Sequence, residues 1–217
     1  MERVEIRTKS QEIEIQLQAL KEKFEREAKI KNREINFISC PWVNQKIEQV
    51  WQDIAAKSIV SKFIPKLPNK ITKIAGIPEL GRELASAVAH YLPEALLIPT
   101  RKMAAGIPGT WDNILLVEDV PSFTTTGRST LAFPFVEKGD VFLLVDDFCA
   151  YGNTALAVER EFQKKKVEVY FAFYVAKLFP ELDQIGIQKL SEKGVRSFAV
   201  VTLTEMTEDG RVIAQVS

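Results

Sequence analysis

The sequence is poor in the two residue types on which many active sites depend. Among 217 residues it has one histidine, His90, and two cysteines, Cys40 and Cys149. Two cysteines are too few for a disulfide framework, and their spacing is not that of metal ligands. A single histidine argues against most zinc sites and against histidine-dependent triads. We therefore expect a fold without disulfides in a reducing, cytoplasmic setting, and chemistry that uses other side chains.

The chain also lacks an excess of charge and a long apolar run. Its 29 Lys and Arg residues equal its 29 Asp and Glu residues, so nothing in the net charge favours nucleic acid or an anionic membrane. No apolar run approaches the roughly 20 residues of a membrane span, and the acidic N-terminus lacks the apolar core of a signal peptide. The prediction is a globular protein that binds neither nucleic acid nor membrane.

Two patterns divide the chain near residue 68. Before it, a helix is expected from a cap at Ser10, with Ile13, Leu17 and Leu20 on one face, and a second helix from about 44 to 63. Between these helices, residues 35–39 look extended. After residue 68, short apolar strands alternate with helices to the end of the chain, which predicts an α/β core over 69–217 with a parallel sheet and crossover helices.

One stretch of this core loses its periodicity. Between Thr100 and Pro134 the sequence supplies Gly, Pro, Thr and basic residues instead of an apolar pattern. Irregular stretches of this length inside a compact domain are more often functional than connecting. We expect a flexible flap over about 103–128 that closes on a site.

The segment from Val141 to Glu159 carries the chemistry. A hydrophobic strand ends in Asp146 and Asp147, and a turn through small residues leads into a helix. Backbone N–H groups in such a turn, with the helix N-terminus behind them, bind phosphate. The two acids would repel a phosphate, so they should face hydroxyls or a metal ion. A sugar phosphate with a diol, or with Mg²⁺, meets both demands.

These residues resemble a known family. VDDFCAYGNTALAV is similar to the 5-phosphoribosyl-1-diphosphate signature of type I phosphoribosyltransferases. The stretch IAGIPELGRELASAVAHYLPEALLIPTRK resembles the pyrophosphate loop, helix and Arg-Lys strand of adenine and xanthine phosphoribosyltransferases. LKEKFEREAKIKNREINFISCPWVNQKI is similar to the N-terminal hood of the xanthine enzymes, and AKLF and SFAVVTLTEMTEDGRV resemble the end of that subfamily.

The resemblance implies a reaction and its partners. Phosphoribose would pass from 5-phosphoribosyl-1-diphosphate to a purine nitrogen with release of pyrophosphate, Mg²⁺ would be bound through the donor, and the protein would be a homodimer. Residues 1–68 would hold the hood. Xanthine is the expected purine, because a lysine in the base site can donate to the ring carbonyls of xanthine, and adenine has no such carbonyl. Two alternatives remain: adenine specificity, and a non-catalytic sensor of the donor with the same fold.

The resemblance also assigns residues to each part of the substrate. The ribose hydroxyls, or Mg²⁺ through water, would be contacted by Asp146 and Asp147. The 5′-phosphate would be held by Ala150, Tyr151, Gly152, Asn153 and Thr154. The diphosphate would be bound by Ala75, Gly76 and Ile77 and approached by Arg101 and Lys102. The purine would be contacted by Phe37, Asn44 and Lys177. Displacement at the anomeric carbon develops negative charge on the leaving diphosphate, so cations such as Arg101 and Lys102 fit that place.

Overall fold

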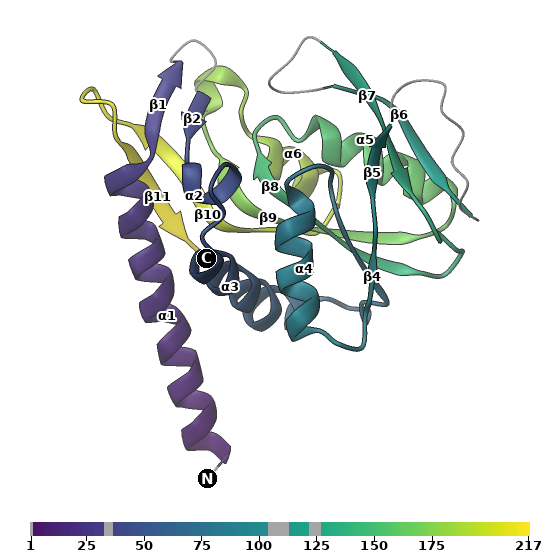
Figure 1. Ribbon diagram of the computed structural model, residues 1–217, viewed down its shortest axis with the longest axis horizontal. Helices are drawn as coiled ribbons and strands as arrows, with labels where there is room; N and C mark the ends of the chain where they lie inside the picture. The colour runs from purple at the N-terminus through teal and green to yellow at the C-terminus, as the bar shows by residue number, and fades with distance from the viewer. Residues whose placement is uncertain (1, 33–36, 104–112, 122–126) are drawn as a thin grey trace.

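A six-stranded sheet forms the centre of the protein (Figure 1). The computed structural model describes residues 2–32, 37–103, 113–121 and 127–217, and within them the side chains of all but residues 2–10 and 44. The sheet order is β11-β10-β9-β8-β3-β4. Its strands are β3 (Lys73–Gly76), β4 (Leu96–Ile98), β8 (Val141–Cys149), β9 (Glu168–Lys177), β10 (Ser197–Met206) and β11 (Val212–Val216).

Five of these strands run parallel, and β11 closes the edge antiparallel to β10. The central strands are apolar on both faces, as parallel strands covered by helices must be. In β8, Leu143 and Val145 belong to one core, whereas Phe142 and Leu144 belong to the other. The predicted α/β class with a parallel-sheet core is therefore confirmed.

Different elements cover the two faces. The first core contains buried residues of α1 (Glu2–Glu27), α3 (Gln49–Ser58) and α4 (Gly81–Tyr91). The second contains residues of α5 (Asn153–Lys164) and α6 (Gly186–Glu192), together with part of a small antiparallel sheet. The described residues also include short helical turns at η1 (Ile59–Phe63), η2 (Ile64–Lys66) and η3 (Pro180–Leu182). Within the described residues, no helix combines the length and the apolar character that crossing a membrane requires.

The N-terminal helices differ from their predicted bounds. Helix α1 begins at Glu2 rather than at Ser10, and Figure 1 shows its first turns extending away from the sheet. The second helix, expected over 44–63, ends at Phe63 as predicted but begins later, at Gln49. Before it, α2 (Pro41–Asn44) ends in a turn, and α3 then continues into the π-helical η1. Pro41 occupies the first turn of α2, where a missing N–H does no harm.

A hairpin stands between α1 and α2. Its strands β1 (Lys29–Asn32) and β2 (Phe37–Ser39) pair antiparallel, and in the described part of the chain they form a sheet of their own. Ile38 on β2 is 2% exposed and belongs to the first core. Ile30 on β1 is partly buried and packs against the same core, so both strands of the hairpin contact the body.

The stretch expected to be irregular contains an antiparallel sheet of order β5-β7-β6. Its strands are β5 (Arg101–Met103), β6 (Leu115–Pro121) and β7 (Arg128–Phe133). In β6, Val117 and Val120 are both buried, because a register shift between them inserts an extra residue, and Asp119 there has a φ of 58°. This bulge hides the strand's period of two. Residues 104–112 and 122–126 of the expected flap lie outside the described residues.

Candidate active site

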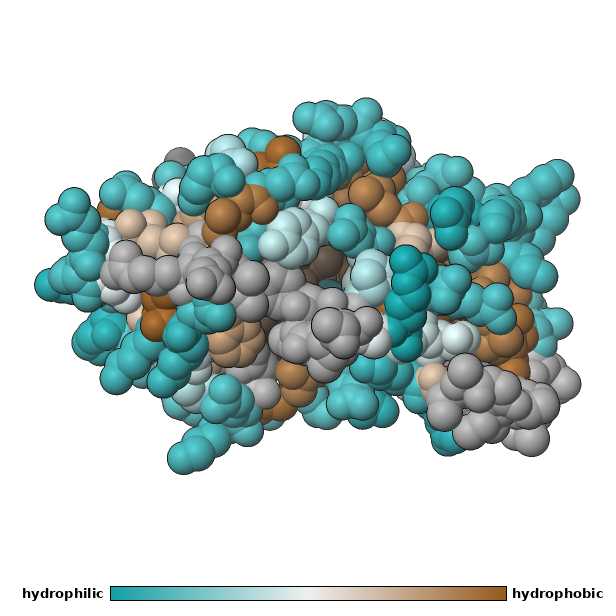
Figure 2. Space-filling model, turned by 90° about the horizontal axis from the view of Figure 1, so that it is seen from above, coloured by the Kyte–Doolittle hydropathy of each residue, from teal (hydrophilic) through white to brown (hydrophobic). Residues whose placement is uncertain are grey.

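A cavity of about 510 Å³ opens beyond the carboxyl ends of β3, β8 and β9. This is the edge at which open α/β sheets place their ligands. Figure 2 looks down on this end of the molecule and shows a recess near the middle of the face. The cavity brings together most of the predicted site: Phe37, Ile77, Lys102, Asp146, Asp147, Ala150, Tyr151, Gly152, Asn153, Thr154 and Lys177.

Three predicted residues, Arg101, Ala75 and Gly76, are not among those that line the cavity. Arg101 is exposed and precedes Lys102 on β5, and successive side chains of a strand point to opposite faces, so only Lys102 reaches the cavity. Ala75 and Gly76 are buried in β3 behind the lining. The side chain of Asn44 lies outside the described residues. Gly76 has a packing role, because a Cβ there would lie 2.4 Å from the backbone of Arg82.

The turn after β8 is shaped by contacts between two glycines. Gly152 has a φ of 75°, and a Cβ on it would lie 2.9 Å from the Cα of Gly186. Gly186 in turn donates its N–H to the carbonyl of Ala150 at 2.8 Å. Helix α5 begins at Asn153, and among the described side chains none caps its first N–H groups. The turn therefore directs backbone donors and the positive end of α5 to the cavity.

Two adjacent carboxylates stand beside this turn. Asp146 and Asp147 are half-buried at the end of β8, and the N–H of Asp147 donates to Oδ1 of Asp146 at 2.9 Å. Burial, and then the charge of Asp147, raises the pKa of Asp146 well above its usual range. Burial also raises the pKa of Asp147. Hydroxyl donors or a cation would stabilise the ionised pair.

The other side of the cavity is apolar and carries one cation. Lys177 ends β9 and is 2% exposed, with Nζ 5.8 Å from the centre of the Phe148 ring. Burial lowers the pKa of Lys177 to about 8. Phe37 of the hairpin, half-buried, lines the same cavity. This end can hold a flat apolar ring and donate a hydrogen bond to its edge.

Sequence reasoning missed several lining residues. Phe148 directly follows the acid pair in VDDF, and its place on a strand beside a ligand site was a usable signal. Glu79 and Leu80 come from the loop after β3, in which the peptide bond between Pro78 and Glu79 is cis. Val120 and Leu131 come from the small sheet, which the sequence did not reveal. Together these residues make the wall more apolar than the predicted set alone.

The described residues contain no group of three or more His, Cys, Asp or Glu side chains placed to hold a metal ion. The carboxylate oxygens of Asp146 and Asp147 are nevertheless the ligand type that Mg²⁺ prefers. An ion carried by a bound diphosphate could reach them through water.

Known proteins resemble the chain in sequence and in structure. No family model matches it. It is 32% identical over 163 residues to the xanthine phosphoribosyltransferase of Lactococcus lactis subsp. lactis, covering 72% of this chain and 77% of that protein. It is 30% identical over 139 residues to the adenine phosphoribosyltransferase of Brucella anthropi, and this match covers 64% of this chain and 72% of that protein.

Among solved structures, the adenine phosphoribosyltransferase of Rhodothermus marinus superposes with a TM-score of 0.62 at 26% identity, over 86% of this chain and 98% of that one. The turn before α5, the acid pair and the parallel sheet that presents them agree with these likenesses. The chain therefore belongs to the type I phosphoribosyltransferase family, among the enzymes that act on purines.

Proposed function

We propose that this protein transfers phosphoribose from 5-phosphoribosyl-1-diphosphate to an oxopurine, with xanthine as the preferred base, and releases pyrophosphate. One observation carries the proposal. A single cavity is lined by the small-residue turn before α5, by the acid pair, by a buried lysine that lies near the Phe148 ring, and by Phe37. A ribose 5-phosphate joined to a purine has groups that suit each of these: a phosphate, a diol, and a flat ring with polar atoms at its edge.

At the donor end, backbone N–H groups of residues 150–154 bind the 5′-phosphate, and Thr154 adds a hydroxyl. The ribose hydroxyls donate to Asp146 and Asp147, which favours the ionised carboxylates that burial disfavours. Lys102 approaches the diphosphate. Mg²⁺, when bound to the diphosphate, supplies charge neutralisation for the leaving group, and the acid pair would hold it through water.

At the base end, the ammonium of Lys177 donates a hydrogen bond to a carbonyl oxygen of the purine. Phe37 and Phe148 provide the apolar faces against which the ring lies. A purine ring nitrogen forms a bond to the anomeric carbon as the bond from that carbon to the diphosphate oxygen breaks. The electron pair leaves with pyrophosphate, which also takes up the proton that the purine loses from its imidazole ring. The apolar wall limits water, which would otherwise compete with the base.

Adenine is the second candidate base. Relatives named adenine phosphoribosyltransferase match the chain at 30% identity over 139 residues. Against adenine stands Lys177, because the exocyclic amine of adenine is a donor and gives an ammonium no acceptor at that position. The two bases therefore differ in what the same side chain can do for them.

The test is a turnover assay with the full chain. The purified protein is incubated with 5-phosphoribosyl-1-diphosphate, Mg²⁺ and xanthine, guanine, hypoxanthine or adenine in turn, and pyrophosphate release is followed. Release with an oxopurine, fastest with xanthine, supports the proposal, and release with adenine alone reverses the base assignment. Tight binding of the donor without turnover of any base would identify a sensor of the donor instead.

We also propose that the protein works as a cytoplasmic homodimer, with residues 1–68 forming a hood and about 103–128 a flap over the cavity. Leu96 on β4 is 64% exposed and Leu97 is 46% exposed, and apolar groups of this size are expected at an interface. Both cysteines are buried free thiols, which suits a reducing compartment. Analytical ultracentrifugation of wild type and of the Leu96→Glu variant tests the dimer, since the variant should sediment as a monomer.

A further inference from the structure

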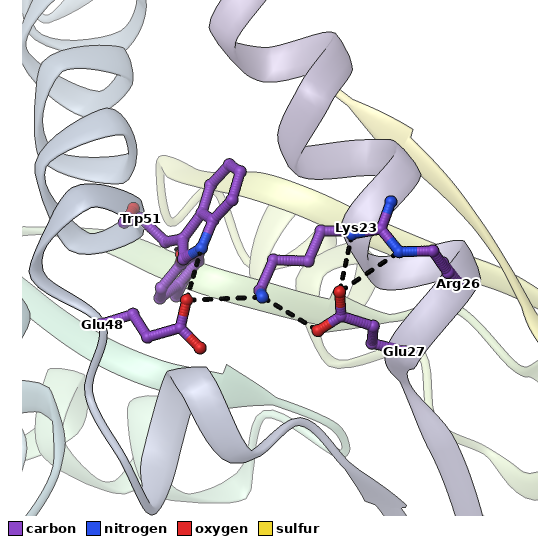
Figure 3. A network of polar contacts seen from close by, with 6 residues as sticks. Lys23, Arg26, Glu27, Glu48 and Trp51 are labelled. Atoms are coloured by element: carbon purple, nitrogen blue, oxygen red, sulfur yellow. Dashed lines mark hydrogen bonds and ion pairs between the residues drawn. The ribbon is translucent and has the colours of Figure 1, made fainter.

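Lys23, in the last turns of α1, occupies surroundings in which lysine is uncommon. The residue is only 7% exposed. Its Nζ lies 2.9 Å from Oε2 of Glu27 and 3.4 Å from Oε2 of Glu48 (Figure 3). The same ammonium lies over two indole rings, 4.8 Å from the centre of Trp42 and 5.3 Å from that of Trp51. One buried cation thus contacts residues of α1, α2 and the segment that begins α3.

The contacts around Lys23 are mutually supporting. The indole N–H of Trp51 donates to Oε2 of Glu48 at 2.8 Å, and Arg26 pairs with Glu27 at 2.6 Å (Figure 3). A lysine taken out of water keeps its charge at a cost, which carboxylates and ring faces reduce. An apolar side chain could fill the same space without that cost. The charge therefore points to a requirement for a fixed geometry rather than for burial alone.

The network sits where the β1–β2 hairpin joins the body. Helix α1 ends at Glu27, just before β1, and Trp42 follows closely after β2. Phe24 and Trp42 also pack edge to face, with ring centres 5.3 Å apart. Both ends of the hairpin are therefore held by contacts around Lys23. Because the hairpin is not hydrogen-bonded into the six-stranded sheet within the described residues, these ends are a main determinant of its orientation.

The hairpin in turn forms part of the cavity. Phe37 and Ile38 of β2 line it. On the other side of the network, the hydroxyl of Tyr174 donates to the carbonyl of Trp51 at 2.9 Å. Tyr174 lies on β9, the strand that ends at Lys177 in the same cavity. The Lys23 network thus connects the two elements that bound the base end, and no contact places Lys23 at the donor end.

We propose that Lys23 is a positioning residue for the purine: it holds the β1–β2 hairpin over the cavity so that Phe37 meets the base. This inference rests on the proposed function and extends it to a side chain outside the cavity. The proposal predicts different effects on the two substrates. Loss of the Lys23 ammonium weakens binding of the purine and leaves binding of 5-phosphoribosyl-1-diphosphate unchanged.

The test compares three variants of the full chain. Lys23→Met keeps the length and apolar stem and removes the charge. Lys23→Arg restores a cation that can pair with carboxylates and lie over rings. Lys21→Met is the matched control, because it removes a 2.7 Å pair with Glu25 on the same helix and at the same i,i+4 spacing. The KM for the purine and the KM for the donor are measured separately for each, with the other substrate saturating.

We expect Lys23→Met to raise the KM for the purine about tenfold, less than the roughly hundredfold effect that a 1 Å displacement of a positioning group can have. The KM for the donor should not change, Lys23→Arg should restore most of the purine affinity, and Lys21→Met should match the wild type. Equal changes in both KM values, or no change for the purine, would overturn the proposal. If Lys23→Met is poorly folded, Glu48→Gln removes charge from the network while keeping an acceptor for Trp51, and the same selective rise is expected on a smaller scale.

A second measurement needs no turnover. Hydrogen exchange of the free protein should be faster in Lys23→Met at the amides of Phe37 and Ile38 and unchanged at those of β8. Unchanged exchange in the hairpin would refute the positioning role even if the proposed reaction is correct. Conversely, if the wild type turns over no purine but the hairpin exchanges faster in the variant, the proposed function fails, and Lys23 orders a hairpin that serves some other purpose.

Discussion

The two proposed ends of the cavity differ in whether backbone or side chains form them. The donor end consists largely of backbone: a turn shaped by Gly152 and Gly186, at the end of the central strand β8. The base end consists of side chains, with Phe37 on a separate hairpin and Lys177 on β9. A backbone site tolerates few substitutions and is recognisable as a continuous motif. A side-chain site is assembled from distant segments and can change its specificity one residue at a time.

A change confined to the donor end tests most strongly whether the two ends act independently. Asp147→Asn removes charge-assisted hydrogen bonds to the ribose, each worth about 1.5 to 3 kcal/mol, so we expect roughly a 10- to 150-fold rise in the KM for the donor. The KM for the purine should change little. Steady-state kinetics with each substrate varied in turn measures both. Unchanged donor kinetics would show that the acid pair does not contact the donor.

A second change tests whether the turn depends on close packing. Gly152→Ala should weaken binding of the donor by about 1 to 3 kcal/mol, because the Cβ of the alanine would crowd the backbone of Gly186. Gly194→Ala is the control, since Gly194 has a nearly identical φ of 74° and nothing within 4 Å of the added Cβ. Donor titrations by calorimetry compare them. Equal losses in both variants would assign the effect to backbone strain and not to the turn's packing.

The base end should respond to a rise in pH through about 8, the pKa of Lys177. Burial lowers the pKa of Lys177 to about 8, so its ammonium is lost as the pH rises through that value. The affinity for an oxopurine should then fall by about 1 kcal/mol, the worth of a typical hydrogen bond. In Lys177→Met the affinity should be low throughout, and the wild type should approach it at high pH. Measuring both on the same base cancels the ionisation of the base itself. Parallel pH profiles of the two proteins would contradict the role of Lys177.

The smallest effect concerns stability. A carboxyl whose pKa is raised by folding holds its proton more tightly in the folded state, so stability falls as the pH rises above the unfolded value of about 4. Asp146→Asn should therefore raise the free energy of unfolding at pH 7 by about 1 kcal/mol, or the Tm by about 2 to 4 °C. The gain should shrink as the pH approaches 4. Thermal unfolding at pH 7 and pH 4 measures it, and a destabilised variant at pH 7 would show that the ionised pair is already satisfied without a ligand.

The sequence predicted the parts of the molecule that depend on local pattern. Long apolar runs such as β8 and β9 identified the sheet, and the turn predicted after Asp147 does line the cavity. It did not predict β6, because the bulge near Asp119 breaks the alternation. It also treated Arg101 and Lys102 alike, although the pleat of β5 sends only Lys102 to the cavity.

The base end was the least predictable for a physical reason. Its residues come from β2, β8 and β9, and only the tertiary fold brings them together. The Lys23 network left no motif in the sequence, because its role depends on contacts between segments distant in the chain. The spacing of residues within one segment cannot reveal such contacts.

The central claim is that the turn of residues 150–154 binds the phosphate of an activated ribose. A crystal structure of the protein with ribose 5-phosphate tests it most directly. We predict that phosphate oxygens accept hydrogen bonds from the backbone N–H groups of this turn, with the ribose hydroxyls on Asp146 and Asp147. A phosphate bound elsewhere, with the turn making no contact to the sugar, would contradict the account.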